Sequence, residues 1–471
     1  MTKLDSFKAA FVICLLVTVT ESASTAQTLK TLVKFDGSNG AYANSILQAR
    51  DGKLWGTTSG SGPSSCGTVF KMSPTGAFTT AITFSCDKHN NPDGYDPQGL
   101  IQGVDGDFYG VSFFGGFGSD DAGTVFKLTP KGVLTVLFSF APDGSNGSGP
   151  VGSLVQGSDG DFYGTTYGGG TAFGYGTVFK ITPKGVLTTL YQFDFTHGAQ
   201  PYAGLAQGTD RNFYGTTYSG GAYGRGTVFK VNPKGTLTVL HSFGETSSDG
   251  ASPVTPLTLG RDGDFYGATP YGGPDNDGTV FKIMPTGVFI NLHDFSETDG
   301  RWPTTLVQAT DGNFYGTTAY GGVNDADGTI FKMTAAGNLT TLHNFDGADG
   351  AGSFGLVQDT NGNFFGLTGV GGDLNCNPPT GCGTVFSFSV SLGPFVVLQP
   401  TFGKVGANIT ILGTNLTGAT SVTFNGTEAK FTVVSKSEIK SVVPVGATTG
   451  KVNVSTPHGT LISNVKFRVT K

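Results

Sequence analysis

A repeat of about fifty residues constrains the fold of this chain more than any other feature of the sequence. A short motif, in which two apolar or aromatic residues precede a glycine, occurs in seven copies from "KLWGTT" to "NFFGLT". Successive copies lie 49 to 54 residues apart, and their glycines are Gly56, Gly110, Gly164, Gly215, Gly267, Gly316 and Gly366. Repeats of this period are typical of propellers and solenoids, because each repeat is one supersecondary unit that stacks on its neighbours.

Each repeat contains four strand-like runs, which the third copy shows most clearly as "SLVQGS", "DFYGTTY", "GTVFKITP" and "VLTTLYQF". The first two runs are joined at Asp159-Gly160, a pair that favours a tight hairpin. The last two are joined by "PKG", whose glycine accepts a positive φ. The chain has 76 glycines and 12% aromatic residues, and no segment has sustained helical periodicity. The sequence therefore predicts an all-β protein, with a seven-bladed β-propeller over residues 27–392.

The ends of the repeat region indicate how such a propeller closes. The run "LKTLVKF" (29–35) matches the fourth strand of the other units but precedes the first complete unit. The seventh unit has a "GTVF" strand, but the segment after it lacks the Leu-x-x-Phe ending of the other fourth strands. We expect the N-terminal run to complete the last blade, which leaves no exposed sheet edge. A competing interpretation makes "PFVV" (394–397) the missing strand.

The sequence pattern changes after the seventh repeat. From about Pro394, alternating runs such as Asn408 to Leu412 and Lys451 to Val454 are divided by glycine-containing turns. Such a pattern predicts a small Ig-like β-sandwich over residues 393–471. This segment has no cysteine and one histidine, His458.

The N-terminus has the features of a secretory signal peptide. Lysines precede an apolar stretch, and small residues lead to an expected cleavage site after Ala26, so that residues 1–26 would be removed. No later segment approaches the ~20 consecutive apolar residues that a transmembrane helix needs. We therefore expect a secreted or cell-surface protein with no membrane span after cleavage.

The remaining four cysteines are expected to form disulfides, because an even number in an exported chain implies pairing. Cys66 precedes the third strand of the first unit and Cys86 follows the fourth, so a hairpin brings them opposite each other. Cys382 occupies the same repeat position as Cys66, but the N-terminal strand offers it no partner, and Cys376 is the available one. The expected pairs are Cys66 with Cys86 and Cys376 with Cys382.

Net charge argues against one class of partner. The chain has 28 basic and 34 acidic side chains and a formal net charge of -6. It therefore has no excess positive charge with which to neutralise a phosphate backbone, and nucleic acid is a poor candidate.

Three sets of repeated polar residues invite a functional interpretation, but each has a simpler structural one. Asp159 and Asp161 resemble part of a calcium loop, yet Phe162 follows where further oxygen ligands would be needed, so a turn role is favoured. Three histidines share one position on fourth strands of separate blades, too far apart to bind one metal. A glutamine recurs in the first strand of six units and is expected to satisfy backbone groups. These residues are His241, His293 and His343, and Gln48, Gln102, Gln156, Gln207, Gln308 and Gln358, with Leu259 as the exception.

The two faces of the predicted propeller differ. Short turns such as "PKG" lie on one face, and the loops between second and third strands and between blades lie on the other. Binding residues tend to lie on variable loops above a rigid scaffold, so the candidate ligand-binding residues are the acids and aromatics of these loops. They are Asp120, Asp121, Tyr175, Tyr223, Asp275, Asp277, Arg301, Trp302, Asp325 and Asp327. A glycan or protein is the expected ligand, no cofactor is expected, calcium is a secondary hypothesis, and ordinary solvated loops are the alternative.

Both halves of the chain resemble known families. The units with the pattern "DG[DN]FYGTT...GG...GTVFK" resemble the bacterial GloVer (Gloeo/Verruco) tandem repeat of choice-of-anchor proteins, over residues 29 to about 390. The first unit, "DGKLWGTT", is also similar to propeller repeats of two-component sensor proteins. The C-terminal segments "PTFGKVGANITILGTNL" and "VPVGATTGKVNV" are similar to the IPT/TIG domain, an Ig-like fold. The resemblance implies an exported bacterial protein and supplies no catalytic residues.

Two function classes follow from the sequence. The first is a non-enzymatic binding or scaffold protein, with the propeller as recognition platform. The second is a propeller hydrolase or lyase that acts on a polysaccharide. Such an enzyme usually has paired carboxylates or a His/Tyr/Arg group that breaks the repeat at the channel mouth. None is evident, so binding is favoured.

Overall fold

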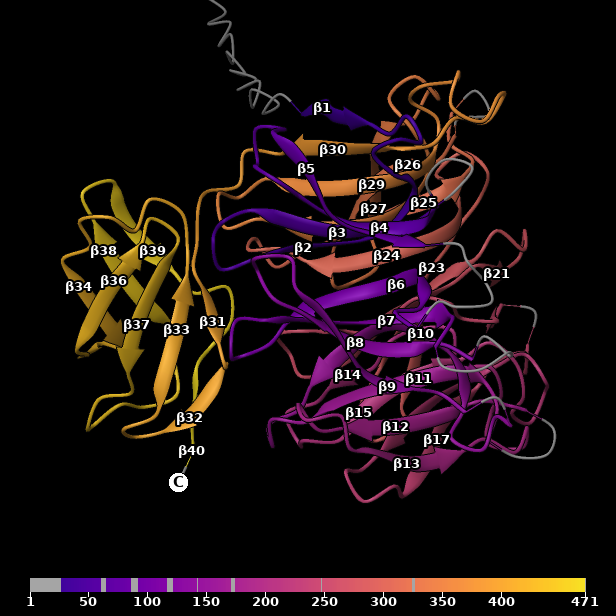
Figure 1. Cartoon of the computed structure of the whole chain (residues 1–471), viewed down its shortest axis with the longest axis horizontal. Helices are drawn as coiled ribbons and strands as arrows, with labels where there is room; N and C mark the ends of the chain where they lie inside the picture. The colour runs from indigo at the N-terminus through magenta and orange to yellow at the C-terminus, as the bar shows by residue number, and fades with distance from the viewer. Residues whose placement is uncertain are drawn as a thin grey trace, which may run out of the picture.

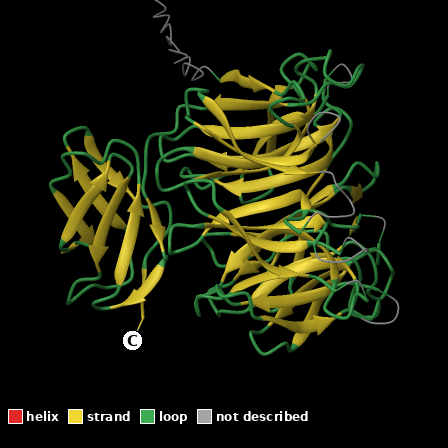
Figure 2. Ribbon diagram, viewed as in Figure 1, coloured by secondary structure: helices red, strands yellow, loops and turns green. Residues whose placement is uncertain are grey.

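The computed structural model describes residues 27–470, apart from 61–64, 86–91, 117–121, 142, 171–173, 247 and 324–326. The described residues form strands, turns and loops and no helix, as Figure 2 shows. The predicted all-β class is therefore confirmed. None of these residues forms a helix of the length and apolarity that a membrane span requires.

Seven four-stranded antiparallel sheets follow one another in the described residues up to Ser389 (Figure 1). Sheets 1 to 3 comprise β2 (Ala41–Gln48), β3 (Leu54–Gly60), β4 (Ser65–Met72) and β5 (Phe78–Ser85); β6 (Tyr95–Gln102), β7 (Phe108–Phe114), β8 (Thr124–Leu128) and β9 (Leu134–Ser139); and β10 (Ser148–Gln156), β11 (Phe162–Gly168), β12 (Thr177–Ile181) and β13 (Leu187–Gln192). Sheets 4 and 5 comprise β14 (Ala206–Gln207), β15 (Phe213–Thr217), β16 (Thr227–Val231) and β17 (Leu237–Ser242); and β19 (Thr258–Leu259), β20 (Phe265–Thr269), β22 (Thr279–Ile283) and β23 (Phe289–Asp294). Sheet 6 comprises β24 (Arg301–Gln308), β25 (Phe314–Tyr320), β26 (Thr329–Met333) and β27 (Leu339–Asn344), while β18 (Gly250–Ala251) and β21 (Tyr271–Gly272) pair separately.

The seventh sheet joins the two ends of the repeat region. It contains β28 (Ala351–Gln358), β29 (Phe364–Val370), β30 (Thr384–Ser389) and, as its outer strand, β1 (Thr28–Lys34). Strand β1 runs antiparallel to β30, with Thr28 opposite Ser389 and Lys34 opposite Thr384. The pairing expected for the N-terminal run is present. The competing candidate is wrong, because Val397 belongs to β31 (Val397–Gln399), which pairs with β33 (Asn408–Leu412).

The aromatic pair of the repeat motif fills the space between adjacent sheets. Neighbouring residues of a strand point to opposite faces, and Phe162 and Tyr163 are both fully buried. The Tyr163 ring stacks on Phe213 of the next sheet at 3.8 Å between centroids, and Phe162 stacks on Tyr109 of the previous sheet at 4.0 Å. Burying both faces of each sheet requires aromatic or apolar residues in succession, which explains why the motif does not alternate.

The acids of the motif stabilise the turn before the second strand. An Asp159 carboxylate oxygen accepts a hydrogen bond from the Tyr163 hydroxyl at 2.7 Å, and the other accepts one from the Asp161 amide at 3.3 Å. Asp161 forms an ion pair with Lys180 on the neighbouring strand at 3.1 Å. The predicted turn role is therefore confirmed.

The glutamines of the first strands connect each sheet to the hairpin of its neighbour. In the third sheet, the Gln156 side-chain oxygen accepts the Val104 amide at 2.9 Å, and its NH₂ donates to the Gly160 carbonyl at 3.0 Å. Equivalent acceptor contacts occur for all six glutamines of the described repeats. The amides thus satisfy backbone groups, as expected, and also hold adjacent sheets together.

The three repeated histidines each pair with an acid in the loop that follows the fourth strand. The distances are 3.2 Å for His241–Asp249, 2.9 Å for His293–Asp299 and 2.8 Å for His343–Asp349. No group of three metal-ligating side chains occurs among the described residues. Each histidine therefore links its own fourth strand to the loop that follows it through contact with an aspartate.

The C-terminal residues form two packed sheets. One contains β31, β33, β36 (Phe431–Ser435) and β37 (Glu438–Val442), and the other contains β34 (Ser421–Phe424), β35 (Thr427–Glu428), β38 (Val452–Thr456) and β39 (Gly459–Ile462). Strands β32 (Phe402–Lys404) and β40 (Arg468–Thr470) pair in parallel. Ile411, Phe424, Ile439 and Val454 from both sheets share one buried core. We call residues 393–470 the C-terminal unit.

The seven sheets present two different faces. The hairpin face carries the turns between first and second and between third and fourth strands, and the loop face carries all other connections. The C-terminal unit lies against the hairpin face (Figure 1). There Ser437 donates to the Arg50 carbonyl at 2.7 Å, and Arg50 donates to the Gln399 side chain at 3.1 Å. The loop face points away from this unit.

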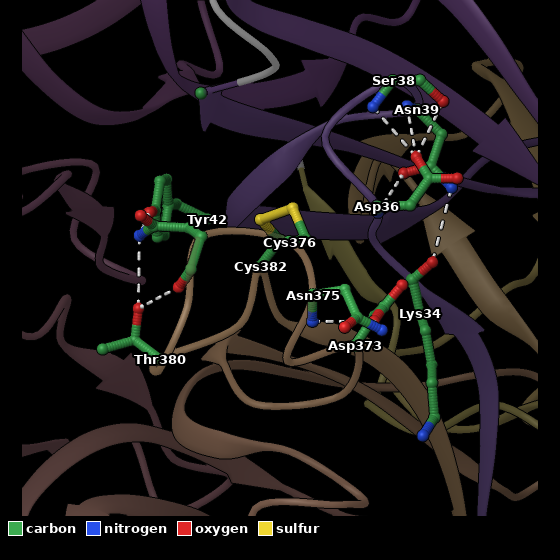
Figure 3. The surroundings of a disulfide bond; sticks show 12 residues. Lys34, Asp36, Ser38, Asn39, Tyr42, Asp373, Asn375, Cys376, Thr380 and Cys382 are labelled. Carbon is green, nitrogen blue, oxygen red and sulfur yellow. Dashed lines mark hydrogen bonds between the residues drawn. A yellow bond between two sulfur atoms is a disulfide. The ribbon is translucent and has the colours of Figure 1, made fainter.

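One expected disulfide is present on the loop face. Cys376 and Cys382 are bonded, with 5.6 Å between their Cα atoms, and the short segment between them curves beside Tyr42 (Figure 3). Asn377 of that segment donates to the Tyr42 hydroxyl. Cys66 takes part in a disulfide, while its expected partner Cys86 lies outside the described residues.

Candidate functional site

A ring of residues with positive φ surrounds the inner edge of the loop face. Each repeat has Gly-X-Z followed by Pro, Ala or Ser at the start of its first strand or shortly before it, and residue Z has φ between 54° and 60° in all seven repeats. We call these the ring positions: Tyr42, Asp96, Gly149, Gln200, Ser252, Trp302 and Gly352. Residues other than glycine rarely adopt this conformation, and such outliers cluster at ligand sites.

The loops of the preceding sheet hold the ring positions in place. The amide of Gln200 donates to the Tyr175 carbonyl at 2.8 Å, and the amide of Trp302 donates to the Asp277 carbonyl at 2.9 Å. The Gly352 amide makes the same contact with Asp327 at 3.0 Å. The backbone geometry is therefore constant around the ring, whereas the side chains differ from sheet to sheet.

A cavity of about 760 Å³ opens on the loop face, and of the ring positions Trp302 is part of its lining. All seven sheets contribute to its wall, and aromatic side chains dominate its rim: Tyr167, Tyr202, Tyr218, Tyr271, Trp302 and Phe354. Ring centroids lie 5.6 Å apart for Tyr167–Tyr202, 6.3 Å for Tyr202–Tyr218 and 5.3 Å for Tyr271–Trp302. The size and lining of the cavity suit a small ligand or a segment of a larger one.

Polar groups lie between these aromatic rings. The Gln200 NH₂ donates to the Tyr167 hydroxyl at 3.0 Å, and its oxygen accepts from the Ser219 hydroxyl at 2.9 Å. Asn44, which is also part of the wall, donates to the Pro97 carbonyl at 3.0 Å. The site thus combines flat apolar surfaces with a few fixed hydrogen-bonding groups.

Asp96 is the acidic member of the ring. Burial raises its pKa to about 6, against a smaller lowering by a hydrogen bond with Gln98. One of its carboxylate oxygens is buried and has no hydrogen-bond partner among the described residues. The pKa of Tyr202 is raised by burial and then by the charges of Tyr167 and Asp96, so the acid lies near this aromatic cluster.

The loop residues predicted from the sequence fall into three groups. Trp302 lies in the cavity wall, and Arg301 lies beside it, 3.9 Å from Asp277 and 3.6 Å from Glu297. Tyr175, Asp277 and Asp327 support the ring through their carbonyl groups. Tyr223 and Asp275 are exposed and do not line the cavity, and Asp120, Asp121 and Asp325 lie outside the described residues.

Sequence reasoning missed most of the cavity lining. Tyr167 and Tyr202 belong to the aromatic rim, and the ring residues Tyr42, Asp96 and Gln200, which are not part of the lining, were missed as well. The available signal was the residue before the recurring proline in "GYDP", "GAQP", "GASP" and "GRWP". This position varies within an otherwise regular repeat, which is the pattern expected of a residue that contacts ligand and not core.

Three solved structures with a similar fold are described as enzymes. A streptogramin B lyase aligns with a TM-score of 0.53 and 16% identity, over 77% of this chain and 97% of the lyase. A catalytically inactive virginiamycin B lyase from Staphylococcus aureus with quinupristin gives 0.54 and 14%, over 77% and 99%. A fungal copper alcohol oxidase gives 0.54 and 14%, over 94% and 99%. At this level of identity the likeness shows a shared propeller-like all-β fold alone.

A family model matches most of the repeat region. A search of curated proteins gives no match. The Gloeobacter/Verrucomicrobia repeat matches residues 96–305 and 246–434, which together span well over half of the chain. The matched segments contain the aromatic–glycine motifs and most of the sheets described above. The chain therefore belongs to the Gloeobacter/Verrucomicrobia repeat family.

Proposed function

We propose that this protein is an exported, non-enzymatic binding protein that recognises an extracellular glycan at the ring on its loop face. In this proposal the seven sheets are the blades of a seven-bladed β-propeller, closed by β1. The C-terminal unit is an Ig-like IPT/TIG-type domain that serves as a spacer or adhesion module. Export rests on the signal-peptide features of residues 1–26, which lie outside the described residues.

The aromatic cavity is the observation that carries this proposal. Sugar rings combine apolar C–H faces with hydroxyl groups, and they therefore pack on aromatic rings while hydrogen-bonding to polar neighbours. The rim supplies the rings of Tyr202 and Trp302, and Gln200 supplies an ordered amide that is hydrogen-bonded to the rim residue Tyr167. Rigid aromatic residues also bind at low conformational-entropy cost, since they have few rotatable bonds.

A glycan array with three variants tests the proposal. Trp302→Ala and Tyr202→Ala remove rim surfaces, and each is expected to weaken array hits at least tenfold, the loss of roughly 1.4 kcal/mol of contact energy. Tyr223→Ala is the matched control, because Tyr223 is 48% exposed and Tyr202 49%, but Tyr223 lies outside the cavity. Hits that tolerate both rim variants, or an array with no hits, would count against the proposal.

The second candidate is a polysaccharide hydrolase or lyase, and Asp96 is the observation that favours it. A carboxyl with a pKa of about 6 and an unpartnered oxygen, two residues before Gln98 of the cavity wall, is suited to transfer protons near neutral pH. A screen of polysaccharides for reducing-end or unsaturated products decides between the two candidates. Turnover that Asp96→Asn abolishes would establish the enzyme, and binding without turnover would leave the binding protein.

A further inference from the structure

A second cavity, of about 500 Å³, lies between the hairpin face and the C-terminal unit. Five cationic side chains line it, two from the hairpins and three from the C-terminal unit: Arg211, Arg261, Lys451, Lys466 and Arg468. No acidic residue is part of its lining within the described residues. The chain has only 28 basic residues and carries a net charge of -6, so this concentration of positive charge departs from its overall balance.

Some of the cationic side chains in this cavity donate hydrogen bonds to backbone carbonyl groups. Arg261 donates to the Ala309 and Thr310 carbonyls at 2.8 and 3.2 Å. Lys451 donates to the Ser463 and Asn464 carbonyls at 2.7 and 2.8 Å. These contacts hold the charges in place without pairing them with a carboxylate. The pKa of Lys451 is lowered by burial and then by the charges of Arg261 and Lys466.

Two further cations have no such contacts. Arg211 and Lys466 make no side-chain hydrogen bond or ion pair with the described residues, although both line the cavity. The nearby Asp311 acts on Arg261, but it is engaged by Lys332 at 3.1 Å and by the Asn313 side chain at 2.7 Å. Arg211 and Lys466 therefore place positive charge in the cavity that is not paired with a carboxylate of the described residues.

The cavity lies at the sheet in which the repeated first-strand glutamine is replaced by another residue. At the other junctions a glutamine accepts the amide two residues beyond the preceding first strand, as Gln207 does from Ser158 at 3.1 Å. Leu259 stands at this position in the fifth sheet, so the Thr209 amide lacks the equivalent acceptor. Thr209 and Leu259 both line the cavity. The departure from the repeat thus leaves a backbone donor beside the cations and places an apolar surface opposite them.

We propose that this cavity binds a small organic anion, a compound with a carboxylate or phosphate group on a partly apolar body. Arg211, Lys466 and the Thr209 amide supply donors for the oxyanion, since charge-assisted hydrogen bonds are the stronger ones. Leu259 and Val465 contact the apolar body. The volume falls within the range of ligand pockets, roughly 300–1,000 Å³. A bound anion joins the two parts of the molecule, because its partners come from both.

Binding titrations on the full mature chain test this assignment. The probes are galacturonate, glucose 6-phosphate, inorganic phosphate and, as a neutral control, glucose. We expect one of the organic anions to bind and to raise the unfolding temperature, with at least tenfold weaker affinity in the Arg211→Gln/Lys466→Gln variant. The matched control Lys184→Gln/Lys234→Gln alters two exposed lysines in turns of the hairpin face and should bind like wild type.

A second variant separates a loss of anion binding from a loss of folding. Leu259→Gln restores the glutamine that six other sheets carry at this position, so it should fold, and its side chain should occupy the Thr209 amide and abolish anion binding. Absence of binding for every anion would overturn the proposal, as would unchanged affinity in both variants. Equal affinity for inorganic phosphate and the organic anions would overturn the assignment of an organic ligand.

Discussion

At the scale of single residues, the repeat motif is explained by architecture. The acid of the turn accepts a hydrogen bond from a tyrosine hydroxyl, and the aromatic pair fills two inter-sheet spaces. The glycine leaves room for a neighbouring aromatic side chain. A Cβ atom on Gly56 would lie 2.3 Å from the Ser45 carbonyl oxygen and 2.4 Å from the Phe70 ring. Residues that the motif does not constrain, such as Asp96 and Trp302, are therefore the ones available for function.

The first residue-scale prediction concerns this glycine. Gly56→Ala should lower the free energy of unfolding by about 1–3 kcal/mol, because the added methyl group overpacks the sheet. Gly393→Ala is the control, since a Cβ there meets no atom within 4 Å and Gly393 has no positive φ. Chemical denaturation measures both. Equal stability of the two variants would contradict the packing account.

The second residue-scale prediction concerns pH. Burial raises the pKa of Asp96 to about 6, from an ordinary value near 3.8, so the folded protein holds this proton more tightly than the unfolded chain. Its contribution to stability is fully present below about pH 4 and is lost as pH rises through 6. Asp96→Asn should therefore stabilise the protein at pH 7 and flatten the stability profile between pH 4 and 6. Asp359, whose pKa is also raised to about 6, leaves a residual slope.

At the scale of elements, the strands could be predicted and the ring could not. Hairpin residues and aromatic pairs have local sequence signals, so the four runs of each repeat were recognisable, as was the pairing of β1. The ring positions have as their signal only a variable residue before a recurring proline, and their positive φ and their hydrogen bonds to loops of the preceding sheet are features of the tertiary structure. The shortness of β14 and β19 was also hidden, since their first-strand segments look like the others in sequence.

The element-scale prediction concerns the glutamine contacts between sheets. Gln156→Leu leaves the Val104 amide and the Gly160 carbonyl without their partner and should cost about 1–3 kcal/mol of stability. Gln192→Leu is the control, because Gln192 is exposed and makes one 3.3 Å contact with the Ser145 carbonyl. Thermal and denaturant unfolding measure the difference. An equally large loss of stability in Gln192→Leu would contradict a specific contribution from the Gln156 contacts between sheets.

At the scale of the whole molecule, the N-terminal strand joins the two ends of the repeat region. Strand β1 begins the described residues and completes the sheet that ends with β30, so residues more than three hundred positions apart share one sheet. The sequence predicted this pairing from the strand missing in the seventh unit. It did not predict that the C-terminal unit rests on the hairpin face, because the contacts of Arg50 and Ser437 depend on tertiary geometry.

The whole-molecule prediction concerns closure. Deleting residues 27–36 removes β1 and exposes the edge of β30, and it should lower the unfolding temperature by ten degrees or more, since an entire strand's hydrogen bonds and packing are lost. Lys30→Ala is the control, because this exposed side chain leaves the backbone pairing intact. A truncated chain that melts at the wild-type temperature would contradict a stabilising role for the pairing of β1 with β30.

The most direct test of the central claim, ligand binding at the loop-face ring, uses the protein's own fluorescence. The chain has two tryptophans: Trp55 is 1% exposed in the core, and Trp302 lines the cavity. Trp55→Phe leaves Trp302 as the sole reporter, and other copies of the motif already carry tyrosine or phenylalanine at that position. On titration with a glycan from the array, the account predicts a shift in Trp302 emission and protection from acrylamide quenching, both saturating with the calorimetric binding curve. Calorimetric binding with no change in Trp302 emission or quenching would contradict it.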